Sequence, residues 1–288
     1  MERWTDNIIR CSIEELKEID FPLDERFGLK VMSGDVEYNL ILNLKSTSDK
    51  LLILGPNAIP YASRDKYLKN NAFSRISWDF DQSTIHYEDP TRFIEGVELL
   101  GGWGIGTEDN WFVKEMAGIF RTIADKLYDY QSTEDSYSNL IFYGSSIGGF
   151  MSILFSILVK NSTSIAEIPQ FDVTKWGYWP TLKKELFSDL TEEEILSRYS
   201  HRFRVYDLIE KCDYIPNTYL ILDCTDERDF NTQFTDFFLK LNELPFSEVN
   251  NVNKVHIRID GKFEGHAVLS KEESYALISN ICLLLDNR

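Results

Sequence analysis

The sequence predicts an α/β fold with a mostly parallel sheet that is entered through an antiparallel N-terminal hairpin. Short, almost continuous apolar runs typical of strands buried on both faces alternate with segments that carry apolar residues at helical spacing. Near the N-terminus, apolar and polar residues alternate on both sides of Gly34 and Asp35, as in a hairpin. A glycine-rich turn later joins a buried strand directly to an apolar helix. This alternation is typical of a parallel sheet, and we expect one domain over residues 1–288.

Each element has its own signal in the sequence. The alternating segment predicts the hairpin at residues 27–45. Apolar runs bounded by turn residues predict strands at residues 50–57, 83–90, 139–144, 162–169, 218–224 and 254–260. Apolar residues at helical spacing, in two cases behind the capping-box pairs Ser12/Glu15 and Ser270/Glu273, predict helices at residues 12–19, 110–131, 148–160 and 270–287. The charged stretch at residues 172–210 predicts a helical cap or insertion.

Composition and charge restrict the classes of function. The chain of 288 residues carries 30 basic and 47 acidic residues, and this net charge of −17 argues against binding to nucleic acid or to an anionic membrane surface. No apolar run approaches the roughly 18 residues of a membrane-spanning helix, and the charged N-terminal stretch is unlike a signal peptide. The four cysteines lack C-x-x-C spacing, and no cluster has metal-site spacing. We therefore expect a cytoplasmic protein with free thiols and without a bound metal.

Residues 144–148 form the motif G-x-S-x-G between a predicted strand and the apolar helix that follows it. In this context the motif is typical of a strained strand-to-helix turn that presents one serine hydroxyl above the sheet. Gly144 and Gly148 leave room for the tight backbone, and Ser146 is the predicted nucleophile. The alternative is a glycine-rich turn that serves packing or binds a phosphate at the helix N-terminus.

A serine hydroxyl needs a base, and in hydrolases with this motif the order along the chain is serine, acid, histidine. Four histidines are available. His86 precedes Ser146, His201 lies in the charged helical stretch, and His256 lies within a predicted strand. His266 lies between the last predicted strand and the final helix, which is where the base is expected. We therefore predict that His266 is the base.

The acid that orients this base is expected on the loop after the strand at residues 218–224. That loop offers Asp223, Asp226, Glu227 and Asp229. Asp223 still belongs to the strand, so we expect Asp226 to orient His266, with Asp229 as the alternative.

An oxyanion hole requires two backbone N–H groups near the nucleophile. One is expected from Ile147, directly after the serine, and the other from the loop after the strand at residues 50–57. Pro56 has no N–H, so Asn57 or Ala58 should supply the second donor.

Two further residues are candidates for substrate contacts. Trp103 lies within the glycine-rich stretch 101–106, which lacks the preceding strand and the acidic partner of a dinucleotide site. We expect a flexible active-site loop there with an aromatic stacking surface; a plain turn is the alternative. Gln170 follows a strand at the carboxyl edge of the sheet and could hydrogen-bond a polar substrate.

With these residues in place, the chain resembles the α/β-hydrolase superfamily from about residue 27 to its end. The likeness rests on "YGSSIGGF", on the Asp226 loop and on Gly265 with His266. More narrowly, "GSSIGG" followed by "IPQFD" after the next strand is similar to bacterial capsule and glycan O-acetyltransferases of this fold. The superfamily resemblance implies a sheet with helices on both faces. The narrower one implies polysaccharide biosynthesis.

The resemblance implies an acyl-enzyme on Ser146 and either hydrolysis or acetyl transfer to a sugar hydroxyl. No bound cofactor is expected. Acetyl-CoA is a candidate acyl donor for a transferase, although the sequence contains no recognisable coenzyme A site. The expected partner is a small-molecule or glycan substrate, and the oligomeric state is left open. The competing hypothesis is a non-catalytic binding or scaffold protein that retains the fold.

Overall fold

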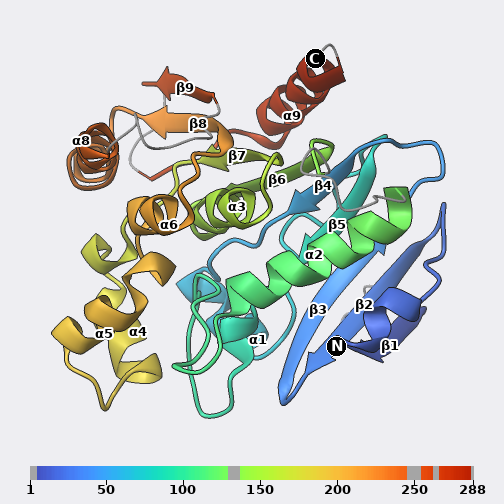
Figure 1. Ribbon diagram of the computed structural model, residues 1–288, viewed down its shortest axis with the longest axis horizontal. Coiled ribbons are helices and arrows are strands. Elements are labelled where there is room, and N and C mark those ends of the chain that lie inside the picture. Colours follow the sequence, from blue (N-terminus) through green and yellow to red (C-terminus); the bar gives the residue numbers. More distant parts are fainter. Residues whose placement is uncertain (1–4, 129–136, 245–253, 262–265, 287–288) are drawn as a thin grey trace.

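The computed structural model describes residues 5–128, 137–244, 254–261 and 266–286. Within these residues, nine strands form one sheet in the order β1-β2-β3-β5-β4-β6-β7-β8-β9 (Figure 1). The strands are β1 (Ile8–Ser12), β2 (Arg26–Ser33), β3 (Val36–Asn43), β4 (Leu51–Leu54), β5 (Ser83–Tyr87), β6 (Leu140–Ser145), β7 (Thr163–Glu167), β8 (Asn217–Asp223) and β9 (Val255–Asp260).

The α-helices are α1 (Arg64–Tyr67), α2 (Phe112–Tyr128), α3 (Ile147–Leu158), α4 (Trp179–Leu186), α5 (Glu192–Tyr199), α6 (Val205–Cys212), α7 (Glu227–Asp229), α8 (Thr235–Glu243) and α9 (Lys271–Asp286). Short 3-10 segments are η1 (Glu15–Glu18), η2 (Tyr61–Ser63), η3 (Pro90–Phe93), η4 (Val173–Lys175) and η5 (Ser200–Arg202), and η6 (Phe230–Phe234) is a π-helix.

The predicted hairpin is confirmed as β2 and β3, which pair antiparallel around a turn in which Gly34 has a φ of 57°. Only glycine adopts this left-handed conformation readily. The sequence analysis missed β1, which pairs parallel with β2 and places Ile9 opposite Leu29. Its isoleucines lie on a half-exposed edge, so the strand lacks the continuous apolar run that identifies buried strands.

Helices cover both faces of the sheet, as expected. On one face, α2 and α3 pack against Ile53, Ile85 and Phe142 of the central strands (Figure 1). On the other face, α9 packs against a second cluster that includes Ile141 and Ile165. Successive strand residues point to opposite faces, so burial on both sides explains why β4 to β8 read as continuous apolar runs.

The parallel strands carry their following loops to one edge of the sheet. β4 pairs with β6, β6 with β7, and β7 with β8, all in parallel. Their carboxyl ends therefore lie side by side, and the loops that follow Leu54, Ser145, Glu167 and Asp223 emerge together. These loops carry the residues that the sequence analysis selected.

The expected helical insertion near residues 172–210 corresponds to the elements from η4 to α6. Its ends are joined: Asp172 forms an isolated β-bridge with Arg204, and their side chains form an ion pair at 3.2 Å. Within it, Thr191 and Glu194 form a capping box at the start of α5. The stretch directly after Asp172 runs past the carboxyl edge of the sheet and contributes Trp176 to the site described next.

Candidate active site

Ser146 lies at the tip of the turn between β6 and α3. Its backbone has a φ of 51° and a ψ of −116°, a combination that residues with a side chain rarely adopt. A Cβ on Gly144 would collide with the backbone of Gly148, and a Cβ on Gly148 would lie 2.5 Å from the carbonyl oxygen of Pro56. Glycine is therefore required on both sides of the strained serine. The Ser146 N–H donates to the Glu167 carbonyl at 2.9 Å.

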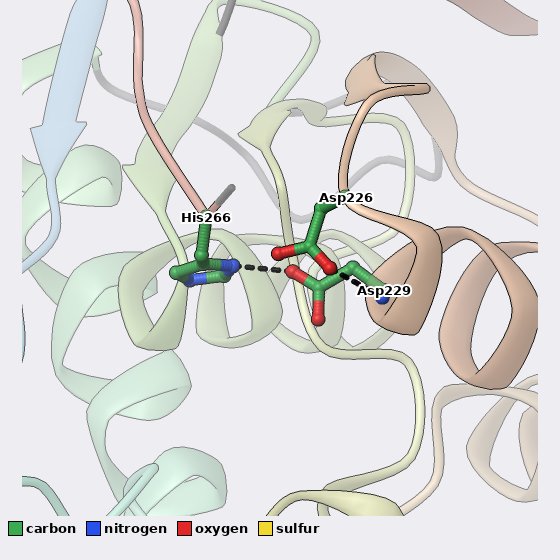
Figure 2. Close-up of side chains that lie close together, drawn as sticks. All are labelled: Asp226, Asp229 and His266. Carbon is green, nitrogen blue, oxygen red and sulfur yellow. Dashed lines mark hydrogen bonds and ion pairs between the residues drawn. The ribbon is translucent and has the colours of Figure 1, made fainter. Parts of the chain in front are cut away.

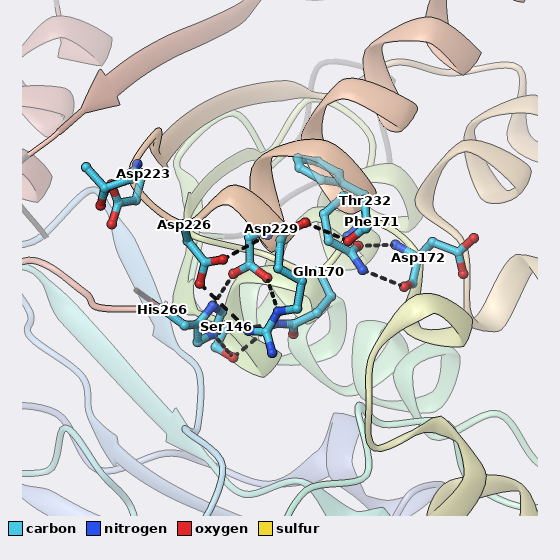
Figure 3. A network of polar contacts seen from close by, with 12 residues as sticks. Ser146, Gln170, Phe171, Asp172, Asp223, Asp226, Asp229, Thr232 and His266 are labelled. Carbon is cyan, nitrogen blue, oxygen red and sulfur yellow. Dashed lines mark hydrogen bonds and ion pairs between the residues drawn. The ribbon is translucent and has the colours of Figure 1, made fainter. Parts of the chain in front are cut away.

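The imidazole of His266 lies beside this serine. Its Nε2 atom is 2.8 Å from Ser146 Oγ, and its Nδ1 atom contacts a carboxylate oxygen of Asp229. An ionised carboxylate can only accept, so Nδ1 carries the ring proton and Nε2 is left to accept from the serine hydroxyl. The His266 side chain is 21% exposed and that of Asp229 is 4% exposed. Figure 3 shows the three side chains as one chain of contacts.

The carboxylate beside His266 belongs to Asp229 and not to Asp226, which the sequence analysis preferred. Asp226 is the N-cap of α7, and its side chain accepts from the backbone N–H of Asp229 at 3.0 Å (Figure 2). An N-cap side chain turns back to the open N–H groups of its helix, whereas a residue one turn further points away from the axis. Asp226, the acid expected from the sequence, therefore stabilises the helical turn that places Asp229 beside His266.

Arg228 and Trp176 lie beside the Asp229–His266 pair. Arg228 lies 3.4 Å from a carboxylate oxygen of Asp229 and 3.7 Å from one of Asp226. Its guanidinium carbon lies 4.3 Å from the ring centroid of Trp176, which is 5.0 Å from that of His266. Arg228 is exposed and Trp176 is half-buried, so both are accessible from solvent. The sequence analysis did not select Arg228.

Gln170 and Trp103 both reach the site, in an unexpected arrangement. The Gln170 side-chain nitrogen donates to Ser146 Oγ at 3.2 Å and lies 3.5 Å from His266 Nε2. The indole N–H of Trp103 donates to the Gln170 side-chain oxygen at 3.1 Å. Gln170 is 1% exposed and Trp103 is 3% exposed. The Trp103 ring is therefore not the open stacking surface that was expected; it orients Gln170 instead.

The loop at residues 101–106 is fastened to the protein and is not the flexible loop that was expected. The backbone N–H of Gly102 donates to one carboxylate oxygen of Asp89 at 2.6 Å, and that of Gly104 donates to the other at 3.1 Å. Asp89 is 1% exposed. Because these bonds are buried, Trp103 occupies a defined position between two anchored glycines.

Two of the backbone N–H groups predicted for the oxyanion hole are open. Among the described residues, neither Ile147 nor Ala58 has a hydrogen-bond partner for its N–H. A Cβ placed on Gly101 would touch the Ile147 side chain and lie 3.7 Å from the Ala58 Cβ, so the side chains of both residues lie beside Gly101. The N–H of Asn57 is already committed to Ser74 Oγ at 3.1 Å. Of the two alternatives, Ala58 is therefore the available donor.

A buried arginine ties this loop to the residue before the nucleophile. Arg75 donates to the Gly55 carbonyl at 2.5 Å and to Ser145 Oγ at 2.6 Å, and Ser145 Oγ donates to the Asn57 side-chain oxygen at 2.9 Å. Arg75 is 5% exposed, and its guanidinium lies 5.0 Å from the ring centroid of Tyr143. Asn57 thus contributes its side chain, and not its N–H, to the geometry of the loop.

Glu167 is the last residue of β7, and its backbone carbonyl accepts the Ser146 N–H. Its carboxylate accepts from the hydroxyls of Tyr143 at 2.7 Å and Ser274 at 3.0 Å. Burial raises the pKa of Glu167, although the Tyr143 hydroxyl and the nearby Arg75 act in the opposite direction. This carboxyl group joins β6, β7 and α9, and within the described part of the chain it forms no hydrogen bond with the Ser146 hydroxyl.

No protein-family model matches the chain, and no curated protein matches it significantly. Solved structures do match it. The capsule O-acetyltransferase of Neisseria meningitidis serogroup A aligns with a TM-score of 0.58 at 12% identity, over 88% of this chain and 96% of that one. S-formylglutathione hydrolase from Agrobacterium tumefaciens gives 0.55 at 11% identity, over 91% and 94%. Staphylococcus aureus FphF, a fluorophosphonate-binding serine hydrolase, gives 0.53 at 12%, over 92% and 99%. The chain has the α/β-hydrolase fold.

In an α/β-hydrolase fold, the loops at the carboxyl edge of the sheet carry the serine, the acid and the histidine. Asp226, Asp229 and His266 also form a group whose ligand atoms lie within 4.8 Å of one another, as in a metal site (Figure 2). Hydrogen bonds and ion pairs explain why these three side chains lie close together. His266 uses one ring nitrogen for Asp229 and the other for Ser146, and the Arg228 guanidinium already faces both carboxylates.

None of the helices in the described ranges has both the length and the apolar character that crossing a bilayer would require.

Proposed function

We propose that this protein is a serine-dependent esterase or O-acyltransferase that works through an acyl-enzyme on Ser146. The observation that carries the proposal is the continuous contact from Asp229 through His266 to the Ser146 hydroxyl, set at a strained turn. A serine hydroxyl is a poor nucleophile until a base takes its proton, and the carboxylate stabilises the ring once it is charged.

In the first half-reaction, His266 Nε2 takes the Ser146 proton while Oγ attacks the carbonyl carbon of the acyl donor. The carbonyl oxygen becomes an oxyanion, for which the N–H groups of Ile147 and Ala58 are the proposed donors. When the tetrahedral intermediate collapses, the bond to the leaving alcohol or thiol breaks, and that group receives the proton from His266. The acyl group remains on Ser146.

In the second half-reaction, a hydroxyl group attacks the acyl carbon and gives its proton to His266 Nε2. The bond between the acyl carbon and Ser146 Oγ then breaks, His266 returns the proton to Oγ, and the acylated alcohol or free acid leaves. Gln170 is within hydrogen-bond range of both Ser146 Oγ and His266 Nε2, which is the region that this hydroxyl must enter. Its NH₂ group is therefore proposed to orient the incoming oxygen. Water gives an esterase, and a sugar hydroxyl gives a transferase.

A carbohydrate acceptor and an acetyl donor are the finer part of the proposal. They are supported by the motifs "GSSIGG" and "IPQFD" and by the similarity to the meningococcal capsule O-acetyltransferase, one structure of which is a complex with CoA. Acetyl-CoA is accordingly the proposed donor for a transferase, as a substrate and not as a resident cofactor. The half-exposed ring of Trp176 beside His266 offers a surface on which a sugar could stack.

The test is to follow the acyl group. The protein is mixed with p-nitrophenyl acetate or with acetyl-CoA, and intact-mass spectrometry measures the acetyl-enzyme. Free acetate and acetylated sugar are then quantified with and without an acceptor glycan. The proposal expects one acetyl group per chain, absent in Ser146→Ala. If neither donor acylates the wild type and folded Ser146→Ala binds glycan equally well, the protein is a binding module with this fold.

A further inference from the structure

A cavity lies against the N-terminal strands of the sheet, and β5 and β4 separate these strands from β6, which leads to the nucleophile. It has a volume of about 570 Å³, and its floor is formed by β1, β2 and β3. Residues alternate along β2: Leu29 and Val31 belong to the main core, whereas Gly28 and Lys30 face away from it. The stretch at residues 66–73, together with Phe93, covers this polar side of the strands. The volume is that of a ligand pocket, for which about 300–1,000 Å³ is usual.

The lining has the opposite charge to the rest of the chain. The whole sequence has 30 basic and 47 acidic residues. The cavity is lined by four cations and one carboxylate, namely Arg10, Lys30, Lys66, Lys69 and Glu37. Glu37 is paired with Lys30 at 2.7 Å, and the Lys69 ammonium donates to backbone carbonyls, two of them at 3.1 and 3.0 Å. Arg10 has no ion pair among the described residues. Counted by formal charge, the lining formed by the described residues therefore carries an excess of positive charge.

Two side-chain amides in the lining have unmet hydrogen-bonding capacity. Asn39 on β3 is only 8% exposed, and its side chain has no hydrogen-bond partner among the described residues. The side-chain oxygen of Asn71, in the covering stretch, is buried and likewise unpartnered there. Buried polar groups are almost always hydrogen-bonded, because an unpaired one loses its interactions with water without replacement. The Asn71 oxygen is such a group. The Asn39 amide lines the same cavity and its polar atoms remain accessible there, so the two side chains could hydrogen-bond one polar ligand.

The stretch at residues 66–73, which covers the cavity, is held in place by two buried charged side chains. The Glu88 carboxylate accepts from the backbone N–H of Ala72 at 2.9 Å and pairs with Arg92 at 2.7 Å. Arg92 in turn donates to the carbonyl of Tyr67 at 2.5 Å and to that of Asn70 at 3.3 Å. Both charged side chains are 1% exposed. This buried ion pair therefore fastens the covering segment to the residues that follow β5.

We propose that this cavity binds a small anionic ligand with hydroxyl groups, of the class of sugar phosphates. Arg10 and Lys66 would hold the anion, and Asn39 and Asn71 would hydrogen-bond the hydroxyl groups. The site is separate from the reaction site, because β5 and β4 lie between β3 and the strand that leads to Ser146. The proposal therefore stands or falls independently of the acyl-enzyme.

The test is isothermal titration calorimetry on the full chain carrying Ser146→Ala, so that turnover cannot contribute heat. The probes are glucose 1-phosphate, inorganic phosphate, glucuronate and glucose. We expect one molecule of glucose 1-phosphate per chain, weaker binding of inorganic phosphate and no binding of glucose. Binding of glucuronate as tight as that of glucose 1-phosphate would assign the site to carboxylated sugars within the same anionic class.

Single substitutions distinguish binding in this cavity from attraction to the charged surface in general. Arg10→Ala and Lys66→Ala should each weaken glucose 1-phosphate binding about tenfold, the loss of one charge-assisted contact. Asn39→Asp keeps the shape, adds a negative charge and should abolish binding. Lys184→Ala on α4 makes the same charge change at an exposed position and should bind like the parent. Thermal unfolding shows whether each variant is folded. If Asn39→Asp fails to fold, Lys66→Ala still tests the proposal, because Lys66 is exposed.

Absence of binding by every anion at millimolar concentration would overturn the proposal. An equal weakening in Lys184→Ala and Lys66→Ala would also overturn it, because it would show attraction to the surface in general. Labelling of the parent serine by a fluorophosphonate should be unchanged in Arg10→Ala and Lys66→Ala. A loss of labelling in these variants would contradict the separation of the two sites.

Discussion

Trp103 donates its indole N–H to the side-chain oxygen of Gln170 and thereby determines which end of that amide faces the serine. Indole nitrogen can only donate, so it selects the oxygen end of the amide and turns the NH₂ group toward Ser146 and His266. A buried hydrogen bond of this kind is a positioning device, because without it the amide could rotate and place an acceptor beside the nucleophile.

The first prediction concerns this pair. Gln170→Ala removes the donor and should lower kcat for ester hydrolysis about ten- to a hundredfold, toward the effect of losing an oxyanion donor. Trp103→Phe keeps most of the buried ring but frees the amide to rotate, so its effect on kcat should be smaller. Steady-state kinetics of both variants checks this. A Trp103→Phe variant that is less active than Gln170→Ala would contradict the assigned order of roles.

The second prediction separates two neighbouring carboxylates. Asp229→Asn should lower kcat by about three to four orders of magnitude, because the amide no longer stabilises the charged ring of His266. Asp226→Asn should stay within a few-fold of wild type, since asparagine is also a good N-cap. Both variants are isosteric and are compared in the same esterase assay. A severe defect in Asp226→Asn with a mild one in Asp229→Asn would restore the original assignment.

The third prediction compares two arginines near the site. Arg75→Met leaves the Gly55 carbonyl and the Ser145 hydroxyl without their donor, which should lower the free energy of unfolding by about 1–3 kcal/mol and reduce kcat with little change in KM. Arg228→Met removes an exposed guanidinium, and its effect on unfolding should not exceed about 1 kcal/mol. Urea denaturation and steady-state kinetics measure both. Equal effects of the two changes would exclude a special role for Arg75.

The fourth prediction concerns thiol reactivity. Cys224 is exposed, whereas Cys11 and Cys282 are buried. Burial raises the pKa of Cys282 to about 11, so at pH 8 only about one in a thousand of these thiols is ionised. Ellman's reagent should therefore react rapidly with Cys224 and with Cys282 only after unfolding. Replacing Cys224 with serine should remove the fast phase; rapid reaction of the folded variant at Cys282 would contradict the packing of α9.

The fold was predictable where a signal was local or where burial was complete. The hairpin around Gly34 and the strands buried on both faces follow from turn chemistry and continuous apolar runs. β1 was missed because Ile8 and Ile9 lie on a half-exposed edge, where the apolar pattern is short and Arg10 interrupts it. Whether such a segment forms a strand depends on the strand with which it pairs, and the segment's own residues do not reveal that partner.

The site was predictable to the level of the loop and not of the side chain. The spacing around Ser146 and the position of His266 are motif-level signals, and the structure brings these two residues together. Asp226 and Asp229 are the same residue type within one turn, so only side-chain direction distinguishes them. Arg75 could not have been found, because its contacts are with residues 20 and 70 positions away in the chain.

The most direct test of the central claim is labelling by a fluorophosphonate probe with peptide mapping by mass spectrometry. The wild type should carry one label, on the peptide that contains Ser146, and Ser146→Ala and His266→Ala should remain unlabelled while folded. Ser145→Ala is the matched control and should still be labelled, at a lower rate, because Ser145 only supports the adjoining loop. Label retained in folded Ser146→Ala, or absent from the wild type, would contradict the account.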